Sequence, residues 1–135
     1  MIQTFSIDNF QTYCDLLSKK DKHLKAIIKE YGYPPMWTRK QGFETLILNI
    51  LEQQVSLASA KSSFERLKKT YQFIEPHVLA GLSQDNFREC GITKQKGNYI
   101  KLLAERIMIE PDFFNSLENM TNELAKEKLI SLKGI

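Results

Sequence analysis

The sequence is poor in the residues that build metal centres and disulfide scaffolds. It has two cysteines, Cys14 and Cys90, and two histidines, His23 and His77, and these four residues show no paired spacing. Paired cysteine and histidine spacing is the usual sign of a zinc site, and a larger even set of cysteines is the usual sign of a small secreted scaffold. We therefore expect reduced cysteines packed as small apolar side chains and no metal site.

Long apolar runs are also absent from the sequence. No segment approaches the roughly 18 apolar residues of a membrane span, and the N-terminal MIQTFSIDNF lacks the basic and apolar segments of a secretion signal. We expect a cytoplasmic protein without membrane contact. The net charge of +3 permits a polyanionic partner without requiring one.

Apolar residues recur at helical spacing along most of the 135 residues, and alternating strand patterns are scarce. A stripe from Phe43 to Leu51 at i, i+3, i+4, i+7 and i+8 predicts a helix over about 42–55 that is central to the core. Further helices are predicted over 9–17, 22–31, 56–71, 84–90, about 94–108 and about 122–132. Hydrophobic residues make up 42% of the chain, which is enough for a sizeable core.

Side chains suited to helix N-caps precede three of these helices, namely Ser83, Thr93 and Thr121. The segment YGYPPMWTRKQG, residues 31–42, is the one long irregular stretch, and we expect it to wrap around the bundle with Trp37 packed. No composition shift marks a domain boundary. The sequence therefore predicts a single all-α domain over residues 1–135, folded as a compact helical bundle.

The segment ISLKGI at residues 130–135 places a glycine directly after a helical pattern. Such a glycine most often ends a helix. It also fits the first half of a helix-hairpin-helix element, in which glycines allow a tight turn whose backbone N–H groups bind a DNA phosphate without reading sequence. Taken alone, this motif leaves both interpretations open.

Two longer motifs precede this segment, namely FETLILNILEQQVSLASAKSSFERL at 43–67 and FRECGITKQKGNYIKLLAERI at 87–107. In this order and spacing, the three motifs make the sequence resemble the helix-hairpin-helix DNA glycosylases, and more narrowly the 3-methyladenine DNA glycosylase II branch. The signature of that branch includes an ILxQQVS helix end, a GIxxxKaxYI helix start and an LxGIGxWTA hairpin. The resemblance covers about residues 21–135 and implies part of a helix-hairpin-helix glycosylase fold.

The resemblance implies a role in base excision repair. Family members hydrolyse the N-glycosidic bond of alkylated purines such as 3-methyladenine in double-stranded DNA, after extruding the damaged nucleotide into an aromatic-lined pocket, and need no organic cofactor. Their catalytic Asp follows the hairpin and would lie beyond Ile135, so we expect no catalytic residue in this chain and no activity from it. Asp112 does not match that role, because it precedes the hairpin in a segment expected to be a helix-capping loop.

The QQVS motif supplies the first residues that the resemblance assigns to DNA binding. Gln53, Gln54 and Ser56 match it, and Gln54 would enter the gap that the flipped base leaves. Its amide could pair with the orphaned base. The alternative is that Gln53 and Gln54 only cap the C-terminus of the helix that starts near Phe43.

The hairpin supplies the remaining residues assigned by the resemblance. Lys133, Gly134 and Ile135 match its first half, where Gly134 would form the turn and Lys133 would contact a phosphate. We do not expect the monovalent cation that such hairpins hold in the family. Lys94 and Lys96 begin a basic helix, and either face DNA phosphates or belong to a solvated surface.

Two other interpretations stay open. The first is an iron-sulfur relative similar to endonuclease III, whose cluster cysteines would lie beyond Ile135. The stretch QQVSLASA favours the alkylpurine branch instead, because the other branch prefers a Gln-Thr pair followed by a charged residue. The second is a noncatalytic helical module that binds DNA or a protein through its exposed basic helices.

Overall fold

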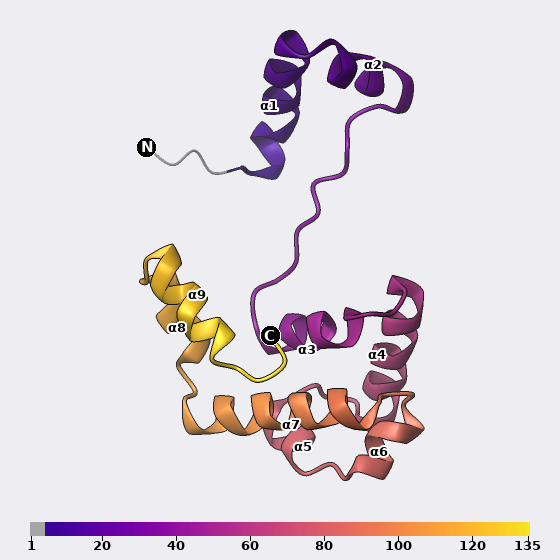
Figure 1. Cartoon of the computed structure of the whole chain (residues 1–135), viewed down its shortest axis with the longest axis vertical. Coiled ribbons are helices and arrows are strands. Elements are labelled where there is room, and N and C mark those ends of the chain that lie inside the picture. The colour runs from indigo at the N-terminus through magenta and orange to yellow at the C-terminus, as the bar shows by residue number, and fades with distance from the viewer. Residues whose placement is uncertain (1–4) are drawn as a thin grey trace. The chain divides into compact units, whose positions relative to one another are not determined.

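The computed structural model describes residues 5–135, and in that range the chain forms α-helices and no strand (Figure 1). The prediction of an all-α fold is confirmed. The chain divides into two compact units, Met1–Arg39 and Lys40–Ile135, which are called here the first and second units. A single domain over residues 1–135 stays a prediction.

The first unit is a pair of packed helices, α1 (Ile7–Lys20) and α2 (Lys22–Tyr31). Asp21 separates them, and its carboxylate accepts hydrogen bonds from the backbone N–H groups of His23 at 2.7 Å and Leu24 at 3.1 Å. This N-cap starts α2 at the residue that the sequence predicts.

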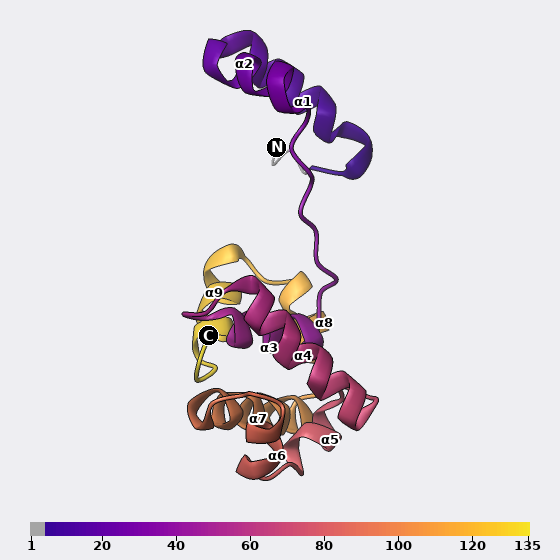
Figure 2. The same cartoon turned by 90° about the vertical axis from the view of Figure 1, so that its right-hand side faces the viewer.

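The irregular segment after α2 departs from expectation. Residues 33–41 form no helix, and Trp37 is 87% exposed, so the prediction of a packed Trp37 is wrong. Pro34 and Pro35 favour extended backbone angles, and the chain leaves α2 as an extended segment (Figures 1 and 2).

The second unit contains the other helices of the described chain, and we give their bounds together. They are α3 (Phe43–Glu52), α4 (Leu57–Tyr71), α5 (Pro76–Ala80), α6 (Gln84–Glu89), α7 (Lys94–Ile109), α8 (Phe113–Glu118) and α9 (Asn122–Ile130). The longest of them is α7, which contacts α3, α5 and α6. Figures 1 and 2 agree that α3 lies on one side of α7 and that α5 and α6 lie on the other.

The core of the second unit forms around α7. This helix buries Gly97, Ile100, Leu103, Ala104 and Ile107. Ile47 and Ile50 of α3 are fully buried against the same cluster, and so are Leu67 of α4 and Phe87 of α6. The apolar stripe that predicts the helix near Phe43 is therefore a core-facing surface, as expected from its spacing.

The predicted N-caps are confirmed at all three positions. Ser83 accepts a hydrogen bond from the Asn86 backbone N–H at 3.2 Å, Thr93 from that of Lys96 at 3.3 Å and Thr121 from that of Leu124 at 3.4 Å. These hydroxyl groups satisfy N–H groups that have no partner within the helix, and so they fix where α6, α7 and α9 begin.

Two short helices differ from the sequence prediction. Helix α5 lies where the sequence predicts no helix. Asp112 is the N-cap residue of α8, so the expectation of a helix-capping segment holds at Asp112 and is wrong for residues 113–118, which form the helix itself. Burial stabilises α8: Phe113 is fully buried, and the Lys128 ammonium of α9 lies 4.7 Å from its ring centre. Helices of five or six residues are too short to show a periodic pattern, and α5 and α8 have no side-chain N-cap hydrogen bond of the kind that Ser83 gives the equally short α6. No helix of the described residues has the length and apolar character needed to cross a membrane.

Candidate nucleic-acid interface

The QQVS motif forms a sharp turn between α3 and α4. Helix α3 ends at Glu52, three residues before the predicted end, because Gln53 adopts an extended ψ of 126° and Gln54 a positive φ of 55°. A positive φ is uncommon for a residue with a Cβ and often marks a functional loop. The side chain of Gln54 is exposed at this turn.

Ser56 fixes the far end of the same turn. Its hydroxyl accepts a hydrogen bond from the Ser59 backbone N–H at 3.1 Å and caps α4. The four-residue connection between α3 and α4 is therefore held at both ends, and Gln54 lies within it. We call residues 53–56 the QQVS loop.

The side chain of Gln53 contacts the hairpin segment, which is distant in sequence but adjacent in space. Its Nε2 group donates a hydrogen bond to the Gly134 carbonyl oxygen at 2.6 Å, across 81 positions of sequence. The backbone of Gln53 ends α3, so the capping interpretation holds for its main chain, whereas its side chain has this separate long-range partner.

Gly134 forms the turn that the hairpin motif predicts. Its φ is +97°, and a Cβ at this position would lie 2.4 Å from the Cγ and Cδ2 atoms of Tyr99. Buried Leu132 anchors the segment, and its carbonyl accepts a hydrogen bond from the Ile135 backbone N–H at 3.2 Å. Both the backbone angle and the aromatic ring therefore require glycine here.

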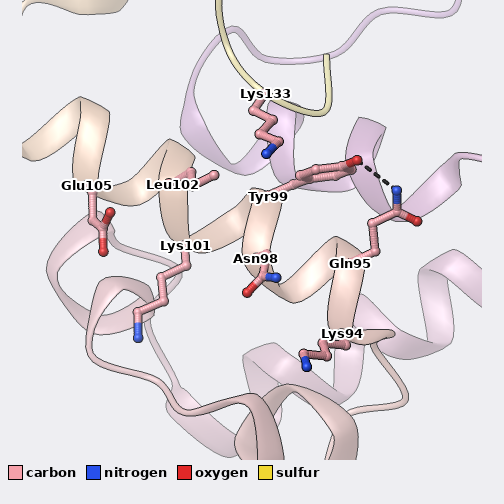
Figure 3. Close-up of a pocket in the computed structure, with 8 residues that line it drawn as sticks. All are labelled: Lys94, Gln95, Asn98, Tyr99, Lys101, Leu102, Glu105 and Lys133. Atoms are coloured by element: carbon pink, nitrogen blue, oxygen red, sulfur yellow. Dashed lines mark hydrogen bonds between the residues drawn. The ribbon is translucent and has the colours of Figure 1, made fainter.

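Tyr99 comes from α7 and is itself held in place. The Gln95 Nε2 group, one helical turn earlier, donates a hydrogen bond to the Tyr99 hydroxyl at 2.8 Å (Figure 3). Residues at i and i+4 lie on the same face of a helix, so α7 presents both side chains toward the hairpin.

Lys96 has an intramolecular partner at the end of α3. Its ammonium donates a hydrogen bond to the Leu51 carbonyl oxygen at 2.6 Å, one of the carbonyls left without a helical partner in the last turn. Burial lowers the pKa of Lys96 from its ordinary value, because desolvation disfavours the charged form. Direct contact between Lys96 and DNA stays a prediction.

Two shallow cavities bring the predicted residues together. The smaller one, of about 300 Å³, is lined by Gln53, Gln54, Gln95, Lys96, Tyr99, Gly134 and Ile135. The larger one, of about 610 Å³, is lined by Lys94, Gln95, Asn98, Tyr99, Lys101, Leu102, Glu105 and Lys133. Figure 3 shows Lys133 extending from the hairpin above α7, with Lys94 near the start of that helix. Of the predicted residues, Ser56 lies outside both cavities and serves as the α4 cap.

The sequence prediction missed Gln95 and Tyr99, which border both cavities. The GIxxxKaxYI motif includes the tyrosine, and its separation from Gln95 by one helical turn is the signal that could have identified the pair. Lysine ammonium, glutamine amide and tyrosine hydroxyl groups are hydrogen-bond donors, and the residues that line the smaller cavity include no acidic side chain. Among residues 5–135, no three His, Cys, Asp or Glu side chains come together as a metal site would need.

A capped loop, a glycine turn after α9 and a basic helix thus meet in one all-α unit, and these features match the first half of a helix-hairpin-helix element. The family comparison agrees, because the HhH-GPD superfamily of base excision DNA repair proteins matches residues 47–131, well over half of the chain. The chain belongs to this superfamily.

Similar proteins come from a yeast and a bacterium. DNA-3-methyladenine glycosylase 1 of Schizosaccharomyces pombe is 29% identical over 127 residues, which are 88% of this chain and 55% of that protein. The solved structure of the S. pombe 3-methyladenine DNA glycosylase in complex with abasic DNA has a TM-score of 0.77 and 27% identity, and the match covers 90% of this chain and 63% of that one.

The crystal structure of a DNA-3-methyladenine glycosidase from Bacillus halodurans has a TM-score of 0.71 and 26% identity, over 99% of this chain and 62% of that chain. The chain therefore spans between 55% and 63% of the length of these relatives.

Proposed function

We propose that this protein acts in base excision repair as a DNA glycosylase for alkylated purines of the 3-methyladenine type. The observation that carries the proposal is the hydrogen bond between Gln53 and Gly134, which joins the QQVS loop to the hairpin turn. Membership of the HhH-GPD superfamily supports the repair role, and the names of the similar proteins support the alkylpurine substrate.

The arrangement suits damaged double-stranded DNA as a partner. The hairpin turn would bind the phosphate backbone, with Lys133 and Lys94 adding ionic contacts, and these contacts carry no sequence information. The exposed Gln54 side chain would enter the space left by the extruded nucleotide, where its amide can hydrogen-bond to the unpaired base.

The chemistry places a small demand on the protein. An alkylated purine such as 3-methyladenine carries positive charge and is already a good leaving group, so hydrolysis needs chiefly a carboxylate that stabilises positive charge developing on the sugar. We assign no residue of 1–135 to that carboxylate. We propose that these residues bind DNA and keep open the gap that the extruded nucleotide leaves in the duplex.

A binding experiment tests the DNA-binding part of the proposal. Fluorescence anisotropy would compare two duplexes of identical sequence, one intact and one with a tetrahydrofuran abasic analogue. We expect tighter binding to the abasic duplex and weaker binding of both as salt increases. Equal affinity for the two duplexes, or a titration that salt does not change, would contradict it.

A pair of glutamine variants tests the role of Gln54. Gln54→Ala should reduce the preference for the abasic duplex without an equal loss of thermal stability. Gln72→Ala is the matched control, because Gln72 is also an exposed glutamine with a positive φ, at the end of α4. If the two variants change the preference equally, the capping interpretation of Gln54 is restored.

Release of 3-methyladenine from methylated DNA tests the catalytic part. The natural gene product should release the base above a heat-inactivated control. Enzyme-dependent release by the 135-residue chain would show that a carboxylate within it is catalytic. Retained binding to abasic DNA without release by the natural gene product would favour a noncatalytic DNA-binding module.

A further inference from the structure

Three contacts connect the end of α3, the start of α7 and the hairpin turn in a closed ring. Lys96 of α7 donates to the Leu51 carbonyl of α3 at 2.6 Å, and Gln53 donates to the Gly134 carbonyl of the hairpin at 2.6 Å. The Tyr99 ring of α7 packs against Gly134, in the space that a Cβ would fill. Each of the three segments is thus tied to both of the others, and we call this arrangement the loop–hairpin junction.

We infer that Gln53, Lys96 and Tyr99 are positioning residues that hold the QQVS loop and the hairpin turn in a fixed relation to one another. The inference rests on the proposed function, because it assigns these side chains a role in binding a duplex that lacks one base. A hairpin bound to phosphate would then place Gln54 at the adjacent base-pair gap without a separate ordering step.

The geometry of Lys96 separates this role from an ionic contact with DNA. A lysine that binds phosphate is normally solvated before binding, whereas the Lys96 ammonium is partly buried and already donates to a backbone carbonyl. That carbonyl is two residues before Gln53, so Lys96 acts on the backbone from which the QQVS loop begins. Lys94, two positions earlier on α7, is exposed and has no comparable constraint.

Gln53 connects the loop to the hairpin without using Gln54. The Gln53 amide is directed to Gly134, while Gln54 has the positive φ and the exposed side chain. Adjacent residues therefore have different roles, one fixing the loop against the hairpin and the other facing the solvent where DNA would lie. Tyr99 completes the ring from the opposite side, and the Gln95 amide sets the direction of its hydroxyl.

The first test needs no DNA. Hydrogen exchange by NMR would follow the Ile135 backbone N–H, which donates to Leu132 within the hairpin. Removal of one hydrogen bond of ordinary strength by Gln53→Ala should speed that exchange about fivefold. Gln54→Ala should leave it unchanged. Unchanged exchange in the Gln53→Ala variant would overturn the inference, whatever the DNA experiments give.

The second test compares Lys96→Met with the matched control Lys94→Met, on the intact and abasic duplexes over a range of salt concentrations. Methionine keeps the aliphatic stem and removes the ammonium group. Lys94→Met should weaken binding to both duplexes alike and reduce the slope of log affinity against log salt by about 0.9. Lys96→Met should leave that slope unchanged and reduce the preference for the abasic duplex about fivefold.

The outcomes separate the inference from the proposed function. If the unaltered chain binds the abasic duplex no better than the intact one, the proposed function fails while the exchange experiment still tests the junction. If the chain prefers the abasic duplex and Lys96→Met behaves as Lys94→Met does, Lys96 is a phosphate contact and the inference fails. Loss of preference without a slope change, together with faster Ile135 exchange in Gln53→Ala, supports it.

Discussion

Replacing Gly134 with alanine should release the hairpin turn while the rest of the second unit stays folded. The added Cβ would lie 2.4 Å from two atoms of the Tyr99 ring, where ordinary contact begins near 3.4 Å. The backbone φ of +97° adds strain of about 1–3 kcal/mol, and the overpacking adds about 1–3 kcal/mol. Together these terms amount to about 2–6 kcal/mol if the turn keeps its native form.

Release of the turn is the less costly response. It gives up the Gln53 hydrogen bond, which contributes about 1 kcal/mol, and the packing of Gly134 on Tyr99, while buried Leu132 can stay in place. Because the chain takes the lower-energy route, the free energy of global unfolding should fall by only about 1–2 kcal/mol. Binding to abasic DNA should weaken much more, because the turn that contacts phosphate is no longer formed.

Urea denaturation and exchange of the Ile135 amide measure the two effects separately. We expect a small shift of the denaturation midpoint together with fast exchange at Ile135. In a Tyr99→Ala background the steric part disappears, so Gly134→Ala should have a smaller effect there. An equal effect in both backgrounds, or an unaltered Ile135 exchange rate in the single variant, would refute the argument from Tyr99.

Three further changes test the scaffold. Gly97→Ala places a methyl group 3.1 Å from the fully buried Phe87 ring. The crowding should cost about 1–3 kcal/mol and outweigh the gain in helix propensity of about 1 kcal/mol, so the urea midpoint should fall. A higher urea midpoint would mean that α6 can move away from α7. The hydrogen bond from Lys128 lowers the pKa of Glu110 from 4.5, so its contribution to stability is complete above that pH and is lost as pH falls through the lowered value. Glu110→Gln should therefore lose less stability than the unaltered chain between about pH 5 and 3, and parallel pH curves would contradict this. Ser56→Ala should cost about 1 kcal/mol by removing the α4 cap, whereas the exposed Ser62→Ala should cost far less in the same melting experiment.

Local patterns in the sequence account for most of the helices. The stripe near Phe43 and the hydroxyl groups of Ser83, Thr93 and Thr121 act within one or two helical turns, so spacing alone identifies them. Helix α8 depends on burial of Phe113 beneath Lys128 from another helix, and no local pattern carries that information. The early end of α3 depends on the positive φ of Gln54, which glutamine seldom adopts.

The candidate site divides in the same way. The motifs identify Gln53, Gln54 and Gly134 as residues of one kind of surface, but the hydrogen bond that joins two of them crosses 81 positions. Only the fold brings the ends of α3 and of the hairpin together. The roles of Tyr99 and Lys96 could not follow from spacing either, because each depends on a backbone segment from elsewhere in the second unit.

The number of exposed lysines without an intramolecular partner around the two cavities sets the expected salt dependence of DNA binding. Lys96 donates to Leu51, and Lys101 donates to the Leu82 carbonyl at 3.1 Å, so both already have intramolecular partners. Lys94 and Lys133 are the exposed lysines that line the larger cavity.

Two phosphate contacts predict a slope of log affinity against log salt near −2, since neutral donors such as the hairpin N–H groups displace few counterions. Anisotropy titrations of the abasic duplex at several salt concentrations measure this slope directly. A slope beyond about −4 would mean that basic groups outside the junction carry much of the binding. A slope near −2 would mean that the protein holds the DNA mainly through neutral hydrogen bonds and shape complementarity. Such contacts would let the protein dissociate readily from an intact duplex and remain bound at a gap.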